Sequence, residues 1–324
     1  MNYGRDEASS LHIKEKFVHF WRSEKGKISL VRDVVIALLL VLILLSALWA
    51  YTGQWGGAPM VAIESGSMMH PNEPFGRYGT IDAGDMVLLV KVNNRNDVVA
   101  RGSEIHGALA RKDTDNFFYG DYGDVIVYRP YGEDNRDQII HRAICWVEVN
   151  FDEEEGIYKY TVTDYGIVDK ESVTIPELGL KEWTHPTKRP DNTPVTPHSG
   201  FITKGDNNDI CDQRSSDLCM EPIKIEWISG KARSELPWIG TINLFFNDLT
   251  GGGNTVGNVP EDCIICLILL IAILVSIPIS LDIYDYYKNQ KKQPVEDYFK
   301  QKSYPKNEDE DLSEGTEKKI DEKF

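Results

Sequence analysis

Two long apolar segments constrain this chain more than any other feature of its sequence. The first runs from Val34 to Tyr51 without a charged residue and ends in aromatic side chains. The second, from Ile264 to Leu281, has a similar length. About twenty apolar residues span a bilayer, and aromatic residues are typical of its interface. We therefore expect two transmembrane helices, at residues 34–52 and 260–282.

A cleaved secretory signal is the alternative for the first segment. The apolar region of such a signal is shorter, about 7–15 residues, and it ends at a small-x-small cleavage site. Here the run is longer and begins only at Val34, and the stretch Ala47–Ala50 offers no clean Ala-x-Ala. We therefore expect this segment to stay as an uncleaved anchor.

Basic residues indicate the orientation of the chain. Residues 1–33 carry seven Lys and Arg side chains and three lysines follow the second span, whereas residues 52–76 carry none. Positive charge favours the cytoplasmic side. We therefore expect a cytoplasmic N-terminal segment at 1–33, an extracytoplasmic domain at 53–259 and a disordered cytoplasmic tail at 283–324.

The middle of the chain is acidic. Residues 53–262 hold 34 acidic and 19 basic side chains, which accounts for almost all of the net charge of −16. Nucleic-acid binding needs a basic surface, so we exclude that class of partner.

The cysteines support limited conclusions. Cys211 and Cys219 flank a loop that we expect outside the cell, where a disulfide persists; a bridge and two unpaired thiols both remain open. Cys263 and Cys266 open the second apolar segment. Despite their CxxC spacing, we expect them to be small lipid-facing residues rather than a metal or redox pair.

The middle domain is predicted to be mainly β. Short runs of branched and aromatic residues alternate with turns rich in Gly, Asp and Pro, which favours an antiparallel, barrel-like fold. The proline-rich stretch Thr184–Ser199 is expected to be a surface loop. The expected strands are Met60–Ile63, Met86–Val92, Val125–Tyr128, Ile139–Val149, Tyr158–Thr163, Phe201–Thr203 and Ile239–Phe246.

Ser67 is the candidate nucleophile. It lies in the turn Glu64–Met68, sixteen positions past the first apolar segment. A serine attacks only when a base takes its proton, and a Ser-Gly-Ser turn by itself is most often structural. Ser65, two residues earlier, is placed to donate its hydroxyl to a developing oxyanion.

His141 is the preferred base, because the expected strand around it would hold its ring rigidly. His70 is near Ser67, but its loop contains two prolines and we expect a positional or solvent role. The remaining histidines precede the first span, lie in the proline-rich loop or lie in a polar stretch: His12 and His19, His185 and His198, and His106.

A carboxylate must fix one ring nitrogen of His141 so that the other accepts the serine proton. Asp206, in Gly-Asp-Asn-Asn, also suits a turn carboxylate that bonds the local backbone. Asp212 is the freer candidate, and Asp209 is a further alternative. The sequence does not decide which of them faces His141.

Six segments occur in the order typical of signal peptidase I, and specifically resemble its archaeal and endoplasmic-reticulum type. In that type a histidine replaces the lysine base of most bacterial relatives. The resemblance covers the first span and most of residues 58–246. The segments are Glu64–Met68, Gly84–Val90, Gly123–Pro130, Ile140–Ile144, Phe201–Asn208 and Gly230–Arg233.

Two departures from the family pattern stand out. The usual Ser-Met-x-Pro becomes Ser67–Pro71, with one added residue. Residues 147–199 exceed the compact core of the family.

The resemblance implies a role for each candidate residue. Ser67 would be the nucleophile and His141 the base, with Asp212 as the required acidic residue. Asp206 would support the site, and Ser65 would help form the oxyanion hole.

The activity implied is that of a hydrolase in the membrane. This serine endopeptidase would remove signal peptides from secreted precursors, cutting after small residues through an acyl-enzyme. No metal or organic cofactor is expected. The expected partners are signal-peptide-bearing precursors, the lipid bilayer and the secretion translocon.

Three other interpretations remain. A membrane-anchored binding or assembly module with the same β-fold would use neither Ser67 nor His141 chemically. A self-cleaving regulator of the related serine–lysine fold predicts a lysine at position 141, and an α/β-hydrolase predicts Gly-x-Ser-x-Gly around its nucleophile. The sequence has neither of these last two features.

Overall fold

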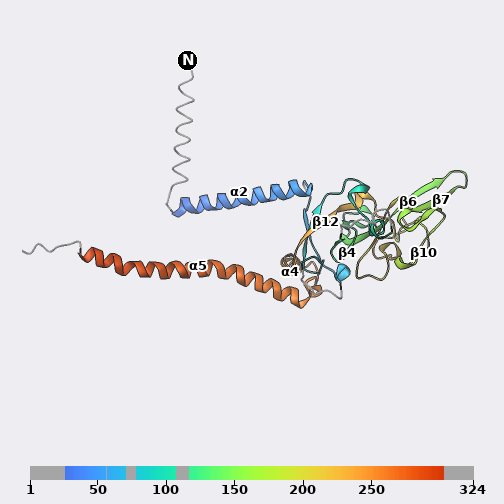
Figure 1. Ribbon diagram of the computed structural model, residues 1–324. Helices are drawn as coiled ribbons and strands as arrows, with labels where there is room; N and C mark the ends of the chain where they lie inside the picture. Colours follow the sequence, from blue (N-terminus) through green and yellow to red (C-terminus); the bar gives the residue numbers. More distant parts are fainter. Residues whose placement is uncertain (1–25, 56, 71–77, 107–116, 303–324) are drawn as a thin grey trace, which may run out of the picture. The chain divides into compact units, whose positions relative to one another are not determined.

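The computed structural model describes residues 26–55, 57–70, 78–106 and 117–302 (Figure 1). The chain divides into two units, residues 1–266 and residues 267–324. The first unit holds the sheet. The helices are α2 (Gly26–Thr52), α3 (Arg101–Ile105), α4 (Gly240–Leu249) and α5 (Glu261–Lys302).

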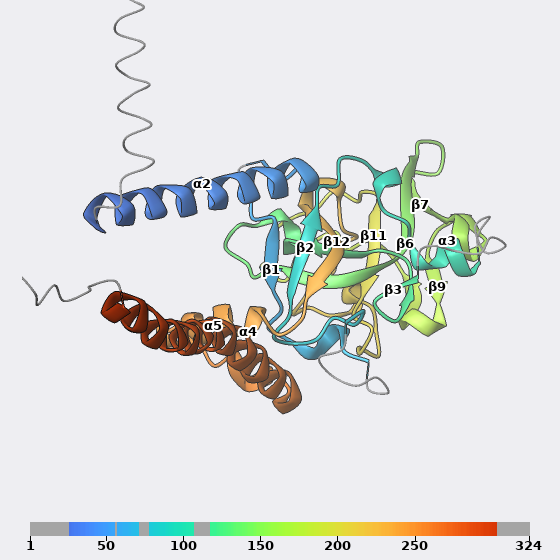
Figure 2. The same cartoon turned by 60° about the vertical axis from the view of Figure 1, so that its left-hand side comes forward.

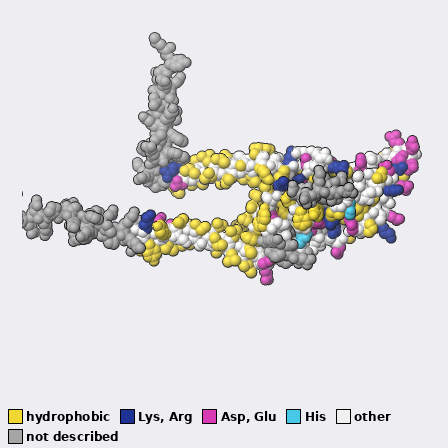
Figure 3. Space-filling view, viewed as in Figure 1, with side chains coloured by type: hydrophobic (Ala, Val, Ile, Leu, Met, Phe, Trp, Pro, Cys, Tyr) yellow, Lys and Arg dark blue, Asp and Glu magenta, His cyan; other side chains and the backbone are white. Residues whose placement is uncertain are grey.

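Two stretches of helix, Leu30–Thr52 and Glu261–Lys288, are long and apolar enough to cross a membrane, by length and composition. In Figure 3 hydrophobic side chains cover most of the visible face of α2. Protein buries none of the most apolar window of this helix. A helix that is apolar all round and unpacked suits a lipid environment.

Both helices exceed the expected spans. Helix α2 begins at Gly26 rather than at residue 34. Helix α5 continues to Lys302. We expected residues 283–302 to be disordered, but they are helical. The rest of the predicted tail, 303–324, and most of the segment 1–33 lie outside the described residues.

The domain between the helices is mainly antiparallel sheet. Eight strands run in the order β1-β2-β12-β5-β6-β7-β8, with β11 paired to β6, and no pairing among the described strands closes them into a barrel. The strands are β1 (Met60–Ala62), β2 (Met86–Val90), β5 (Val125–Tyr128), β6 (Ile139–Asp152), β7 (Ile157–Val162), β8 (Ile167–Lys170), β11 (Gly200–Lys204) and β12 (Ile228–Leu236).

Two small hairpins accompany the large sheet: β3 (Phe117–Phe118) with β4 (Asp121–Tyr122), and β9 (Val173–Ile175) with β10 (Leu180–Trp183). The extra segment 147–199 thus contributes the second half of β6, strands β7 to β10 and the proline-rich loop. Its core is apolar and includes Tyr160, Val162, Leu180 and Trp183.

One predicted strand is wrong. The stretch Ile239–Phe246 forms most of helix α4, and the strand β12 before it was not predicted. Trp238 has a φ of 65°, which breaks the extended chain at the end of β12. Of the next ten residues only Leu244 buries a large apolar side chain, so a helix with one buried side satisfies this segment better than a strand.

Strand β6 lies beside β11 and β7 (Figure 2) and connects the two parts of the large sheet. Its first half pairs with β5 and with β11, and its second half pairs with β7. Buried apolar residues pack on both faces of this region, around Ile126 and Ala143 on one side and around Val127 and Ile140 on the other. A side chain on β6 is therefore held rigidly.

All five cysteines are free thiols, so no bridge joins Cys211 to Cys219. Cys263 is fully buried with Leu244 and Val259 in a small apolar cluster. The expectation that it faces lipid is therefore wrong. Cys266 is partly exposed.

Candidate active site

Ser67 lies on a short 3-10 turn, Gly66–Met68, that follows strand β1. Ser65 precedes this turn in an extended conformation, with φ of −127° and ψ of 157°. Met68 is fully buried in the apolar core with Ile63 and Ile140. Met68 anchors the turn in the core, and Ser67 beside it is partly buried.

The two serine hydroxyls of this turn are neighbours. Ser65 Oγ lies 3.3 Å from Ser67 Oγ, and the Ser65 side chain is exposed. A hydroxyl at this distance from the nucleophile is positioned to donate to an oxygen that forms beside it.

Hydrogen bonds from the Gly205–Asn208 segment hold the turn Gly66–Met68 in place. The Asn207 backbone N–H donates to the Ser67 carbonyl at 2.9 Å, and its side-chain amide donates to the Gly66 carbonyl at 3.0 Å. A Cβ at Gly205 would lie 2.7 Å from the Ser67 carbonyl oxygen and 2.9 Å from His141 Nε2. The serine backbone and the histidine ring therefore meet at Gly205, where only glycine fits.

His141 and Asp212 form a buried pair. His141 Nδ1 lies 2.7 Å from Asp212 Oδ2, with both side chains almost completely buried. Because the carboxylate accepts the Nδ1 proton, Nε2 keeps its lone pair and is the nitrogen that can act as a base. This geometry settles which carboxylate orients His141: it is Asp212.

Two further side chains hold Asp212 in place. Tyr128 and Thr203 donate their hydroxyls to the same Oδ2 atom, at 2.7 and 2.6 Å. Burial and the Asp212 charge raise the pKa of Tyr128 well above its usual value, so its hydroxyl remains a donor. The other oxygen of Asp212 is buried without a hydrogen-bond partner among the described residues.

The register of the sheet explains this convergence. His141 pairs with Ile126 on β5, and Ala143 pairs with Thr203 on β11. Residues two apart on a strand share a face, so Tyr128, His141 and Thr203 point to the same side. Asp212, on the 3-10 turn Asp212–Arg214, then meets all three.

Asp206 belongs to a separate network. Arg142 follows His141 on β6 and points to the opposite face, where its buried guanidinium donates to both oxygens of Asp206. Arg142 also donates to the backbone carbonyls of Phe118, Tyr119, Asp121, Tyr122 and Gly123.

His70 completes the Asp206 network, with Nε2 2.9 Å from Asp206 Oδ2. Burial alone would raise the pKa of Asp206, but the hydrogen bonds from Arg142 and His70 hold that pKa below its ordinary value. The same contact raises the pKa of His70. His70 therefore has the positional contact that we expected, and it ties the loop after Ser67 to Asp206.

The structure brings some candidates together and leaves others apart. In the part of the chain that it describes, no hydrogen bond joins Ser67 Oγ to His141, although both border Gly205. Such catalytic contacts are often long before substrate binds. Asp209 is exposed, and His106 is exposed at the end of α3.

Sequence reasoning missed Tyr128, Thr203 and Gln213. The Gln213 side chain accepts from the Thr203 backbone N–H at 3.0 Å and so supports the turn that carries Asp212. Tyr128 and Thr203 lie inside two of the segments quoted for the family resemblance. Nothing in those segments marks their hydroxyls as partners of a carboxylate.

No family model matches this chain, and no curated protein matches its sequence.

Proposed function

We propose that this chain is a membrane-bound serine endopeptidase of the signal peptidase I type, which removes signal peptides from secreted precursors. The observation that carries the proposal is the buried His141–Asp212 pair, whose free nitrogen Nε2 borders the Ser67 turn at Gly205. The ordered motifs and the two candidate membrane helices support it.

The proposed reaction follows the serine–histidine–aspartate pattern. Ser67 Oγ attacks the carbonyl carbon of the scissile bond while His141 Nε2 takes its proton. Asp212 stabilises the imidazolium that forms. The bond to the leaving amine then breaks as His141 returns the proton to that nitrogen, and water hydrolyses the resulting ester in a second round.

The charge that develops on the substrate oxygen needs donors. Ser65 Oγ, next to Ser67 Oγ, is one proposed donor, and the backbone N–H of Ser67 is the second. Donors fixed before the reaction stabilise a developing oxyanion more than the ground state. This division of roles explains why two serines stand side by side in one turn.

The substrate would bind as an extended strand. Among the strands that the structure describes, β1 pairs with β2 alone and so forms an edge of the sheet, and it leads within a few residues to Ser67. An unpaired edge accepts a peptide through main-chain hydrogen bonds, with shallow pockets selecting small side chains near the cut.

The proposed setting is the cell membrane. Both termini would be cytoplasmic, and the β domain, a barrel-like signal-peptidase domain in this proposal, would lie on the extracytoplasmic face beside the translocon. A precursor presents its apolar helix in the bilayer and its cleavage site near the surface. An anchor that ends shortly before the nucleophile places Ser67 at a similar depth.

The test is cleavage of a membrane-embedded precursor by the full chain in vesicles. Wild type is expected to cut after a small residue, and Ser67→Ala and His141→Ala to lose at least about 1,000-fold in kcat. Ser216→Ala, at an exposed serine, is the matched control and should cleave normally. Wild-type rates in the Ser67 and His141 variants would instead favour the non-catalytic binding or assembly module.

A further inference from the structure

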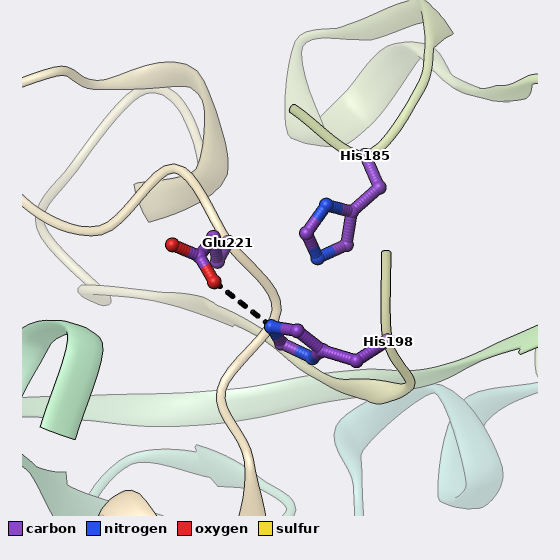
Figure 4. Close-up of side chains that lie close together, drawn as sticks. All are labelled: His185, His198 and Glu221. Carbon is purple, nitrogen blue, oxygen red and sulfur yellow. Dashed lines mark hydrogen bonds and ion pairs between the residues drawn. The ribbon is translucent and has the colours of Figure 1, made fainter. Parts of the chain in front are cut away.

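Three metal-ligating side chains converge at a second place in the domain (Figure 4). His185 and His198 come from the two ends of the proline-rich loop. Glu221 lies two residues before Ile223, which forms an isolated β-bridge with Phe201. One ligand atom of each lies within 4.8 Å of the others. The first two were expected on a surface loop, but His185 is only 3% exposed.

The His185 ring offers an unused electron pair. Its Nδ1 lies 2.8 Å from the Pro186 carbonyl oxygen. A carbonyl only accepts, so Nδ1 carries the ring proton and Nε2 carries the lone pair. That Nε2 atom is buried with no hydrogen-bond partner in the described part of the chain. A buried polar atom without a partner is costly and calls for a ligand.

A ring with its proton on Nδ1 and a lone pair on Nε2 is neutral imidazole, which is the form that binds metal ions.

The His198 ring is surrounded by acceptors on both sides. Its Nδ1 lies 3.1 Å from the Ser199 carbonyl oxygen, and its Nε2 lies 2.9 Å from Glu221 Oε2. Without a metal, each of these contacts is a hydrogen bond only when a proton lies between its two atoms. A metal ion can take the place of the Nε2 proton, because both Nε2 and the carboxylate oxygen then become ligands.

The hydrogen bonds around these three side chains resemble those around metal ligands in proteins. In both histidines a backbone carbonyl accepts from Nδ1, which is the contact that orients metal-bound imidazoles. Glu221 is almost fully buried, and Arg189 Nε donates to its Oε1 atom at 2.6 Å. Arg189 already compensates part of the negative charge of the Glu221 carboxylate. The affinity for a metal ion must therefore come mainly from the two imidazoles. This favours transition ions over Ca²⁺ or Mg²⁺.

We propose that His185, His198 and Glu221 bind a divalent transition metal ion, zinc by preference, which fastens the proline-rich loop to the domain. Two imidazoles and one carboxylate form a common donor set of zinc, with a fourth position for water. Ligand atoms around tetrahedral zinc are roughly 3.4 Å apart, so the widest pair closes by on the order of 1 Å.

The bound ion has a structural role, apart from the hydrolysis proposed above. The Glu221 carbonyl accepts from Gln213 Nε2 at 3.2 Å, and Gln213 adjoins Asp212. The ion therefore steadies the same segment that carries the acidic residue of the active site, without contacting substrate.

The test is metal titration of the full chain in detergent after removal of metals with a chelator. Co²⁺, followed by visible absorption, and Zn²⁺, followed by calorimetry, are each expected to bind once per chain. His185→Asn, His198→Asn and Glu221→Gln should each weaken binding by at least about 100-fold. His106→Asn, at an exposed histidine, is the control and should bind as wild type does.

Near-UV circular dichroism of the metal-free variants identifies any that fail to fold, and the comparison then uses the folded ones. The proposal is overturned if the wild type binds neither ion. It is equally overturned if the folded ligand variants bind as tightly as the His106 control, because the ion then lies elsewhere.

Discussion

At the scale of single residues, the neighbouring residues His141 and Arg142 each pair with a different aspartate. His141 faces Asp212 on one side of the sheet, and Arg142 faces Asp206 on the other. Asp212 thus orients the proposed base, whereas Asp206 neutralises a fully buried guanidinium. The two aspartates stand close in sequence, but substituting them should have different consequences.

Asp212→Asn is expected to lower kcat by about 10,000-fold, because an amide no longer selects the tautomer with a free Nε2. Asp206→Asn is expected to lower the free energy of unfolding by roughly 3 kcal/mol, because Arg142 loses its buried partner, with a far smaller effect on kcat. Precursor cleavage and denaturant unfolding measure the two effects. The assignment is wrong if the larger loss of kcat follows Asp206→Asn.

The sequence predicts the residues of this site better than their pairing. Ser67 and His141 follow from motif order and from an expected strand. The choice between Asp206 and Asp212 does not, because it depends on which face of β6 each meets. Tyr128 and Asp212 are 84 positions apart and meet only through the register of β5, β6 and β11.

At the scale of elements, the ends of β2 and β12 bury two acids. Asp85 precedes β2, and Glu235 lies on β12 opposite Val87. Burial, opposed only in part by backbone hydrogen bonds, raises the pKa of Asp85 to about 7 and that of Glu235 to about 8. Such acids bind their protons more tightly in the folded state than in the unfolded state.

Glu235 should therefore make the domain less stable as pH rises. Its contribution is fully present below the ordinary pKa of 4.5 and is lost as pH rises towards about 8, at about 1.4 kcal/mol per pH unit. Relative to wild type, Glu235→Gln should gain stability over that interval in urea unfolding at a series of pH values. A difference that stays constant with pH would contradict this prediction.

Helix α4 is the element that sequence patterns assign wrongly, and its exposed face is informative. Leu244 is buried in the small cluster with Val259, whereas Phe245, Phe246 and Leu249 are more than half exposed. A short run of branched and aromatic residues predicts a strand here, but the preceding break at Trp238 and the single buried leucine suit a helix. Exposed aromatic residues of this kind suit a membrane interface.

An environment-sensitive fluorophore on Phe246→Cys should therefore shift to the blue in vesicles and resist a water-soluble quencher. The same fluorophore on Ser216→Cys, an exposed polar site, should remain fully quenchable. Equal quenching at both positions would show that α4 does not enter the interface. Emission spectra and quenching constants of the reconstituted full chain supply the measurement.

At the scale of the whole molecule, helix α2 is fastened to the domain that carries Ser67. The carbonyl of Thr52, the last residue of α2, accepts from the Lys91 backbone N–H at 2.8 Å. The side chain of Gln54 donates to the Ser229 carbonyl at 2.6 Å. These contacts link the end of α2 to β12 and to the residue after β2, so the position of the Ser67 turn relative to the end of α2 is fixed. Composition predicts the anchor, but only the structure shows this attachment.

The central claim is that Ser67 and His141 act as one catalytic unit beside the membrane, and a double-mutant comparison tests it most directly. Cleavage of a membrane-embedded precursor is measured for wild type, Ser67→Ala, His141→Ala and the double variant. Residues of one unit are strongly non-additive, so the double variant should be no slower than either single variant. Single losses that multiply in the double variant, or single variants that cleave at the wild-type rate, would contradict the account.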